Sequence, residues 1–370
     1  MMLCRLRGAL VAAALLAASA RAHATPDISL GGIIQPQLKW QQHDANANVA
    51  NQGESGFVLR RARLIAVGHL PTRSILWEAR AEADMVPGFQ LLDAYLAANA
   101  ELPKRGFWRI TLGQHFAPFS RQTILSAADL QMVDFAQLVS LTPGRQIGIS
   151  GILGLPYAPW LQVSGGVFNG KGINVVENID SNFMYVGRVA FRPIGPRARL
   201  IESALGEDAV WVAFDISWNK KRLGDFSEKT LLLGADAFCS FKGFSAYVEY
   251  LWGDVTYTSN APNPNYHLQG FNAQAGYLFP IPGWLFRRLE VTARFEAVAP
   301  NQSVPITGPG DPTQARWSMI GGLSYYHRAH NVKVQLNYLH NAQLDDHDAA
   351  GKYAGYANDQ FLAQFTYRLE

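Results

Sequence analysis

Residues 332–338 read VKVQLNY, and residues 359–369, near the end of the chain, read DQFLAQFTYRL. In both stretches apolar and polar residues alternate, so an extended strand would have one apolar and one polar face. A run of about ten residues is the length of a tilted β-strand that crosses a membrane. The same alternation in residues 289–295, LEVTARF, predicts strands with one face toward lipid and the other toward water.

Sixteen such segments follow one another along the chain. We place them near residues 31–41, 56–69, 73–85, 89–100, 106–117, 143–154, 158–169, 183–193, 208–219, 229–240, 243–254, 266–280, 286–299, 315–328, 331–342 and 359–369. Short turns, such as 70–72 and 102–104, alternate with longer polar loops, such as 42–55, 170–182 and 220–228. This alternation is typical of membrane barrels, whose short turns lie at one face and longer loops at the other. The sequence therefore predicts an all-β protein, a transmembrane 16-stranded antiparallel β-barrel.

The number of strands is least evident between residues 195 and 219. Residues 197–205 and 210–218 each have a composition compatible with a strand. Two strands here would put a loop where the alternation requires a turn. We therefore expect one strand in this region.

A soluble β-sandwich is the main structural alternative, because it also consists of alternating strands. Aromatic residues at the ends of the predicted strands favour the barrel, since a membrane barrel has such girdles. They are Trp40, Trp77, Trp108, Trp218, Tyr250, Trp252, Tyr325 and Tyr338. The polar strand faces also carry many charges, which the core of a sandwich could not hold unpaired.

The N-terminus is predicted to be a secretory signal peptide. Arg5 and Arg7 precede an apolar stretch at 9–18, and the small-residue pattern Ala22-His23-Ala24 follows. About ten apolar residues are too few for a spanning helix, which needs roughly 20. We expect residues 1–24 to be removed and residues 25–370 to form a single barrel domain.

Charge and cysteine content limit the classes of partner. Removing the three leader arginines from the 32 basic residues leaves 29, which equals the 29 acidic residues. Selectivity must therefore come from where the charges lie, and nothing in the overall charge indicates a nucleic acid partner. Cys4 leaves with the leader, so Cys239 has no cysteine to pair with inside the mature chain.

One stretch, residues 120–142, departs from the strand pattern. Its apolar residues, from Ile124 to Phe135, repeat more like those of a helix. A loop this long and apolar would be unstable in water, so we expect it to fold into the lumen as a partly helical constriction loop. An external lid is the alternative.

Six motifs, in order, give the chain a family resemblance. They are residues 57–64 (FVLRRARL), 92–96 (LDAYL), 113–120 (GQHFAPFS), 143–148 (PGRQIG), 166–170 (GVFNG) and 188–193 (RVAFRP). With these motifs the chain resembles the phosphate-selective porin O and P family. The resemblance implies a homotrimer of 16-stranded barrels in the outer membrane of a Gram-negative cell, conducting phosphate or related anions. In that family a lysine often stands at the position of Phe116, so the preferred anion stays open.

If the apolar strand faces meet lipid, many charged residues face the lumen. The cations are Arg61, Arg63, Arg80, Arg109, Arg188, Arg192, Arg288, Arg294, Arg316, Arg328, Lys333 and Arg368. The acids are Glu78, Glu82, Asp84, Asp93, Asp215, Asp236, Glu249, Glu290 and Glu296. The cations outnumber the acids, and cationic rings attract anions. Arg60 would point away from this face and lie at an interface unless the strand bulges, because neighbouring residues of a strand alternate.

From these residues we predict the site. The pore-lining or anion-binding residues are Arg61, Arg63, Arg80, Asp93, Tyr95, Arg109, Arg121, Arg188, Arg192 and Arg294. Asp93 and Tyr95 match a lumenal pair of the family, and Arg121 comes from the loop. The alternative role for these charges is a network of salt bridges that only holds the barrel wall in shape.

The function predicted from the sequence is passive diffusion of small hydrophilic solutes, with selectivity for anions and without a cofactor. A general diffusion porin is the first alternative. An outer-membrane barrel enzyme of the lipase type would need a serine and a histidine on one outer face, and no such pair stands at strand spacing. Residues 345–348, DDHD, lack the glycine and the final acid of a calcium-binding loop.

Overall fold

The computed structural model describes residues 25–42, 55–72, 74–195, 201–203, 205, 208–258, 264–279, 288–300, 315–343 and 359–369. The predicted signal peptide and residues 345–348 lie outside these ranges. Among the described residues, no helix is long and apolar enough to cross a membrane.

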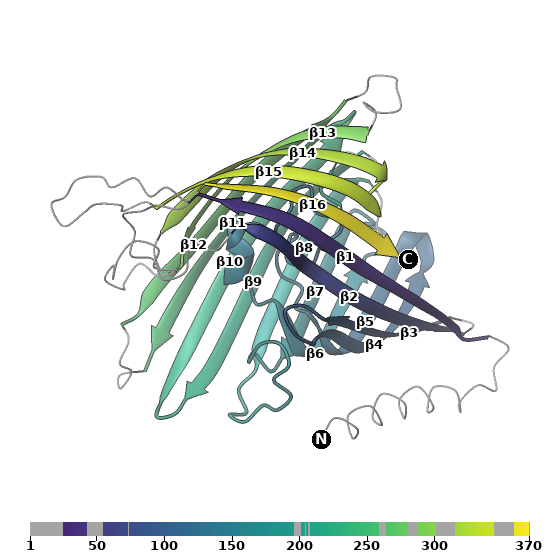
Figure 1. The fold of residues 1–370 in the computed structure, drawn as a ribbon. Coiled ribbons are helices and arrows are strands. Elements are labelled where there is room, and N and C mark those ends of the chain that lie inside the picture. Colours follow the sequence, from purple (N-terminus) through teal and green to yellow (C-terminus); the bar gives the residue numbers. More distant parts are fainter. Residues whose placement is uncertain are drawn as a thin grey trace.

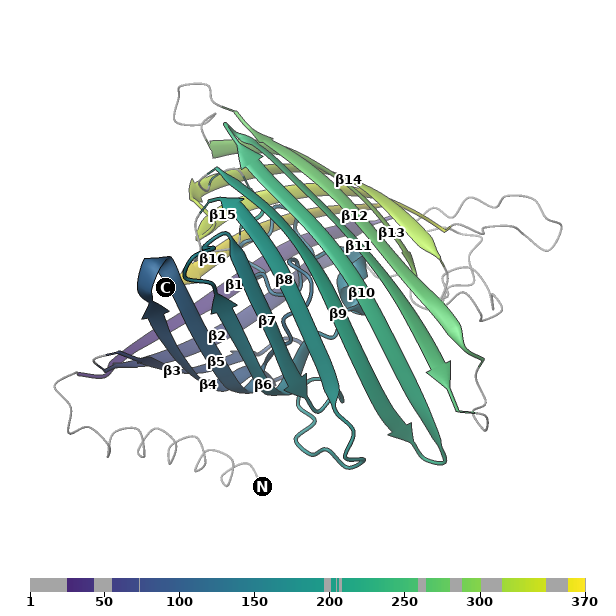
Figure 2. The same ribbon diagram turned by 180° about the vertical axis from the view of Figure 1, so that it is seen from behind.

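The strands form one closed barrel in which each strand pairs antiparallel with its neighbours in sequence, and the first pairs with the last (Figures 1 and 2). The strands are β1 (Asp27–Gln41), β2 (Gly56–Pro71), β3 (Leu76–Asp84), β4 (Gln90–Leu102), β5 (Gly106–Phe116), β6 (Arg145–Gly154), β7 (Leu161–Phe168), β8 (Met184–Ile194), β9 (Ala209–Leu223), β10 (Phe226–Phe241), β11 (Phe244–Tyr257), β12 (Tyr266–Leu278), β13 (Leu289–Ala299), β14 (Arg316–Arg328), β15 (Val332–Gln343) and β16 (Gln360–Leu369). Each predicted strand overlaps one of them, including the single strand expected near 208–219. The predicted fold class is confirmed.

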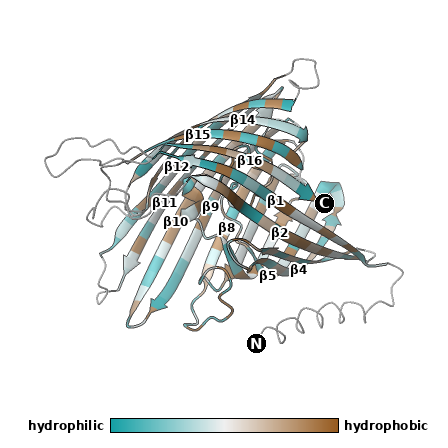
Figure 3. Ribbon diagram, viewed as in Figure 1, coloured by the Kyte–Doolittle hydropathy of each residue, from teal (hydrophilic) through white to brown (hydrophobic). Residues whose placement is uncertain are grey.

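Hydrophobic and hydrophilic residues are mixed along the strands (Figure 3), and the alternation has the expected consequence for burial. In β16 the outward Phe365 and Tyr367 are exposed, whereas the inward Gln364 and Thr366 are almost fully buried. Exposed apolar side chains face outward on nearly every strand. A closed barrel with an apolar outer face can stand in lipid, because every backbone group of its strands has a partner in the sheet.

Most connections at the end that carries both termini are short, as in the turn between β10 and β11, but the one between β8 and β9 spans residues 195–208. Phe241 pairs with Phe244, and the two turn residues, Lys242 and Gly243, both have positive φ. That geometry matches the twist of two-residue hairpins. The C-terminal end of β16 and the start of β1 lie at this same end.

The prediction of a loop over residues 220–228, at the opposite end of the barrel, was wrong. Leu223 of β9 pairs with Phe226 of β10, so only Gly224 and Asp225 remain for the turn where a loop over 220–228 was expected. The polar residues there extend two paired strands. Strand ends that lie beyond the apolar band meet water on both faces, so their polarity did not indicate a loop.

A β-bulge in β2 changes the direction of one arginine. Gln35 of β1 pairs with Arg61 and Pro36 pairs with Leu59, which leaves Arg60 without a partner in the register. Pro36 has no N–H to donate to the ladder, and a bulge gives the strand an extra residue and re-aims a side chain. The prediction that Arg60 points away from the lumen face was wrong for this reason.

Candidate permeation path

The connection between β5 and β6, residues 117–144, lies inside the barrel, and we call it the inner loop. Its backbone and side chains bond to inward-facing residues of β1, β15 and β16. Gln35 Nε2 donates to Ala127 O (3.4 Å), Lys333 Nζ donates to Leu130 O (2.5 Å), and Val133 N donates to Asn337 Oδ1 (2.7 Å). Arg368 Nη1 of β16 donates to Asp129 Oδ2 (3.0 Å), so contacts from three neighbouring strands fix the loop.

The inner loop is less helical than its apolar period suggested. Residues 120–136 form turns and bends, and the only helix in the loop is the short 3-10 segment η2 (Gln137–Leu141). Side chains satisfy loop amides that a helix would satisfy internally: the amide of Ala136 donates to Gln122 Oε1 and that of Gln137 donates to Glu296 Oε2. Polar side chains of the loop itself and of the lumenal wall therefore take the place of helical hydrogen bonds.

Apolar packing holds the inner loop against β7–β12. Phe119 belongs to a buried cluster with wall residues that include Phe168, Met184 and Leu251. Leu125, Leu130 and Met132 are also buried. Burying such side chains stabilises by about 1.5–3 kcal/mol each, which supports a fixed position for the loop.

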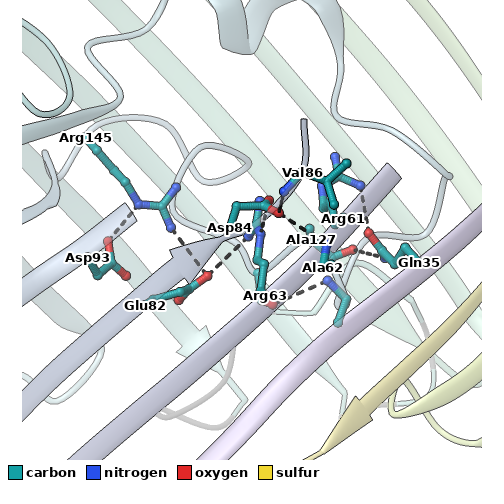
Figure 4. A network of polar contacts seen from close by, with 12 residues as sticks. Gln35, Arg61, Ala62, Arg63, Glu82, Asp84, Val86, Asp93, Ala127 and Arg145 are labelled. Carbon is teal, nitrogen blue, oxygen red and sulfur yellow. Dashed lines mark hydrogen bonds and ion pairs between the residues drawn. The ribbon is translucent and has the colours of Figure 1, made fainter. Parts of the chain in front are cut away.

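The opposite part of the wall, formed by β2–β6, carries a row of ion pairs that is less buried (Figure 4). Arg63 Nε lies 2.9 Å from Asp84 Oδ2, and Arg80 Nη2 lies 2.7 Å from Glu82 Oε2. Arg145 Nε donates to Asp93 Oδ1 at 2.7 Å. The row therefore draws its residues from β2, β3, β4 and β6.

Nearer the end with the termini, the row continues with Arg109. Its Nη1 donates to Glu78 Oε2 at 2.9 Å, and Tyr95 Oη donates to Glu78 Oε1 at 2.8 Å. The side chains of Arg80 and Arg109 are 28% and 23% exposed. One wall of the barrel thus brings together Arg63, Arg80, Asp93, Tyr95 and Arg109.

A group of cations gathers where this wall meets the inner loop. Arg60 Nε and Arg61 Nη2 lie 3.0 and 3.4 Å from Asp134 Oδ1, and Lys39 of β1 lies within electrostatic range of Asp134. The side chains of Arg60 and Asp134 are 45% and 32% exposed, whereas that of Arg61 is 6% exposed, so water reaches Arg60 and Asp134. We call these four residues the Asp134 cluster. Three of its members are cations and one is an anion.

The other arginines of the predicted site are enclosed by protein. Arg188 Nη1 contacts Asp215 Oδ2 and Asp236 Oδ2, each at 2.7 Å, and the three side chains are at most 2% exposed. The guanidinium of Arg192 lies 4.7 Å from the centre of the Trp211 ring. These arginines hold the wall together and are not exposed to a passing solute.

Arg121 and Arg294 are enclosed too, against the inner loop. Arg121 Nη2 donates to Ile201 O, and its guanidinium lies 4.1 Å from the centre of the Phe238 ring. Burial lowers the pKa of Arg121, and the nearby Asp236 opposes that shift. Arg294 donates through both Nη atoms to Asp134 O. The predicted site therefore divides into an accessible set and a buried set.

Among the wider set of lumenal cations, Arg288 and Arg328 also differ from expectation, since both are exposed. Arg288 Nη1 donates to the backbone oxygen of His327. Both residues stand at strand ends, where alternation no longer distinguishes lumen from water.

The Asp134 cluster and the row of ion pairs include three residues that were not predicted from the sequence: Lys39, Asp134 and Arg145. Lys39 follows Gln35 and Gln37 at spacing two, so its inward direction was available from the alternation. Asp134 lies in an irregular loop and Arg145 at the start of a strand. No sequence period places such residues.

Comparison with known proteins agrees with this geometry. The family model described as phosphate-selective porin O and P matches residues 233–369. The chain is an outer-membrane porin. The matched residues lie C-terminal to the six motifs that carried the resemblance, so both halves of the porin now have a link to this family.

Solved structures share the barrel of this porin at low sequence identity. An anion-selective porin from Comamonas acidovorans is 12% identical with a TM-score of 0.61, covering 93% of this chain and 99% of that one. OmpF of Salmonella typhi, in complex with daunomycin, is 14% identical with a TM-score of 0.61, covering 92% and 97%. The channel DcaP of Acinetobacter baumannii is 12% identical with a TM-score of 0.58, covering 93% and 97%. Comparison with curated proteins gives no match.

Proposed function

We propose that the porin conducts small anions by passive diffusion, along a passage between the inner loop and the wall formed by β1–β6. The observation that carries this proposal is the Asp134 cluster, in which Lys39, Arg60 and Arg61 share one carboxylate. A surplus of cations at a narrow point raises the local concentration of anions and lowers that of cations.

The row of ion pairs supports a continuous route for such anions. Arg63 of β2, Arg80 of β3 and Arg145 of β6 each stand against a carboxylate on this wall. A guanidinium has five donors in a planar fork, so an arginine that is paired with a carboxylate still has donors for a passing oxyanion. Phosphate is the anion that the family resemblance puts forward, and a homotrimer is the assembly that it implies.

A general diffusion porin is the second candidate, and the row itself favours it. Each arginine of the row has an acidic partner, so this wall contributes little net charge. If the porin selects anions, the net charge of the Asp134 cluster must provide that selectivity. In a general diffusion porin this charge would have little effect on which ions pass.

The deciding experiment is the zero-current reversal potential of the reconstituted mature protein across a tenfold potassium chloride gradient, followed by titration with phosphate. We expect the sign of the reversal potential to show that chloride permeates more readily than potassium. We also expect millimolar phosphate to block the chloride current. A potential of the opposite sign would contradict the anion-selective proposal. Anion selectivity without phosphate block would leave an anion porin without a phosphate site.

A further inference from the structure

A second connection also lies inside the barrel, where it touches the inner loop. Residues 201–203 belong to the segment between β8 and β9, which starts from the end that carries the termini, whereas the inner loop starts from the opposite end. Glu202 and Ser203 are each 1% exposed. Two segments from opposite ends of the barrel therefore meet within the lumen.

The carboxylate of Glu202 is the centre of this contact. Gln122 Nε2 of the inner loop donates to Oε1 at 2.7 Å, and the backbone amide of Gln131 donates to Oε2 at 2.9 Å. Gln274 Nε2 of β12 also donates to Oε2, at 3.2 Å. All three donors are neutral amides, so the buried charge is stabilised by hydrogen bonds, and two of the three come from the loop.

The residues on either side of Glu202 extend the contact. Arg121 of the inner loop donates to Ile201 O at 2.7 Å. Ser203 Oγ lies 2.7 Å from His330 Nε2, and His330 Nδ1 lies 3.2 Å from Ala128 O in the loop. Residues 201–203 thus join the inner loop to β12 and to the turn before β15.

We propose that Glu202 is a positioning residue that holds the inner loop against the β9–β16 wall and so confines conduction to the passage along β1–β6. Without an acceptor at this place, buried donors of the loop would have no partner, which disfavours the seated loop. A displaced loop would open the space behind it to water and ions. The inference rests on the chain being a porin and is independent of which ion the porin prefers.

The test exchanges the two polar partners without changing their size. In Glu202→Gln, an amide group faces the amide donors of the loop; in Gln122→Glu, a second carboxylate faces Glu202. Each single variant should show single-channel openings to a higher conductance level, with a population raised roughly tenfold, as expected for one lost hydrogen bond to a charged group. The double variant restores a donor opposite an acceptor and should return to the parental conductance.

The matched control is Glu177→Gln, which removes the charge of an exposed glutamate in the β7–β8 loop. It should leave the conductance unchanged. Electrophoretic mobility of unheated samples distinguishes folded from unfolded barrels, and only folded protein enters the comparison. Parental conductance in both single variants would overturn the inference, as would a double variant that behaves like the singles. Neither outcome bears on anion selectivity, which the reversal potential of the parental protein decides.

Discussion

The two sides of this barrel use the same kinds of residue in opposite ways. On the β1–β6 side, arginines and carboxylates form pairs that water reaches, as in Arg80 with Glu82. On the β8–β16 side the inner loop covers the wall, and pairs such as Arg188 with Asp215 are sealed from water. A lumenal arginine is therefore available to a solute only where the loop leaves it uncovered.

The largest expected difference between the two sides is in stability. Arg188→Met leaves the buried Asp215 and Asp236 without their cation, which should lower the free energy of unfolding by about 3–5 kcal/mol. Arg80→Met removes a partly exposed partner and should cost about 0–1 kcal/mol. Denaturant unfolding of both variants in detergent measures the two values. Equal losses would show that the two walls do not differ in the way that their burial indicates.

Substitutions in the Asp134 cluster should have a smaller effect, and this effect is on ion selectivity. Asp134→Asn removes the one anion of the cluster and should raise the permeability ratio of chloride to potassium, whereas Arg60→Met should lower it. A unit charge about 8 Å from a permeating ion in a water-like medium changes its energy by about 0.5 kcal/mol, so each change should be roughly twofold. Reversal potentials measure both. The buried Arg192→Met is the control on the opposite wall and should leave the ratio unchanged.

The smallest expected effect is a pH dependence in the loop between β7 and β8. This loop spans the boundary between the two sides of the barrel. Asn174 N donates to Gln114 Oε1 of β5, and Asp180 accepts from the amide of Arg222 at the end of β9. Burial alone would favour the neutral acid, but Lys171 and the amides of Arg222 and Asn182 hold the pKa of Asp180 well below its usual range.

A depressed pKa in the folded state means that this contact stabilises the loop fully above the unfolded pKa, about 3.9, and loses its effect as pH falls below it. We expect the protection of this loop from proteolysis to fall below about pH 4. Asp180→Asn should remove that pH dependence. If the variant and the parent lose protection in parallel with pH, Asp180 is not the group responsible.

The site was less predictable than the fold because the two depend on different information. Arg63, Arg80 and Arg109 stand within regular strands, and their common face follows from spacing alone. Arg188 and Arg192 follow the same rule and do face inward, but spacing cannot say whether another segment covers them. Arg60 shows the remaining limit, since a single bulge reversed the direction that spacing assigned to it.

The sequence by itself determined the architecture of this protein: sixteen alternating segments, their order, and the face that each turns to lipid. It could do so because the direction of a strand side chain repeats every two residues, and lipid tolerates only apolar groups on a closed barrel. Only the tertiary structure decided which charges reach water, where the inner loop is seated, and that Glu202 meets it from the other end. Those features depend on contacts between segments such as Glu202 with Gln131 and Val133 with Asn337, which no local period encodes.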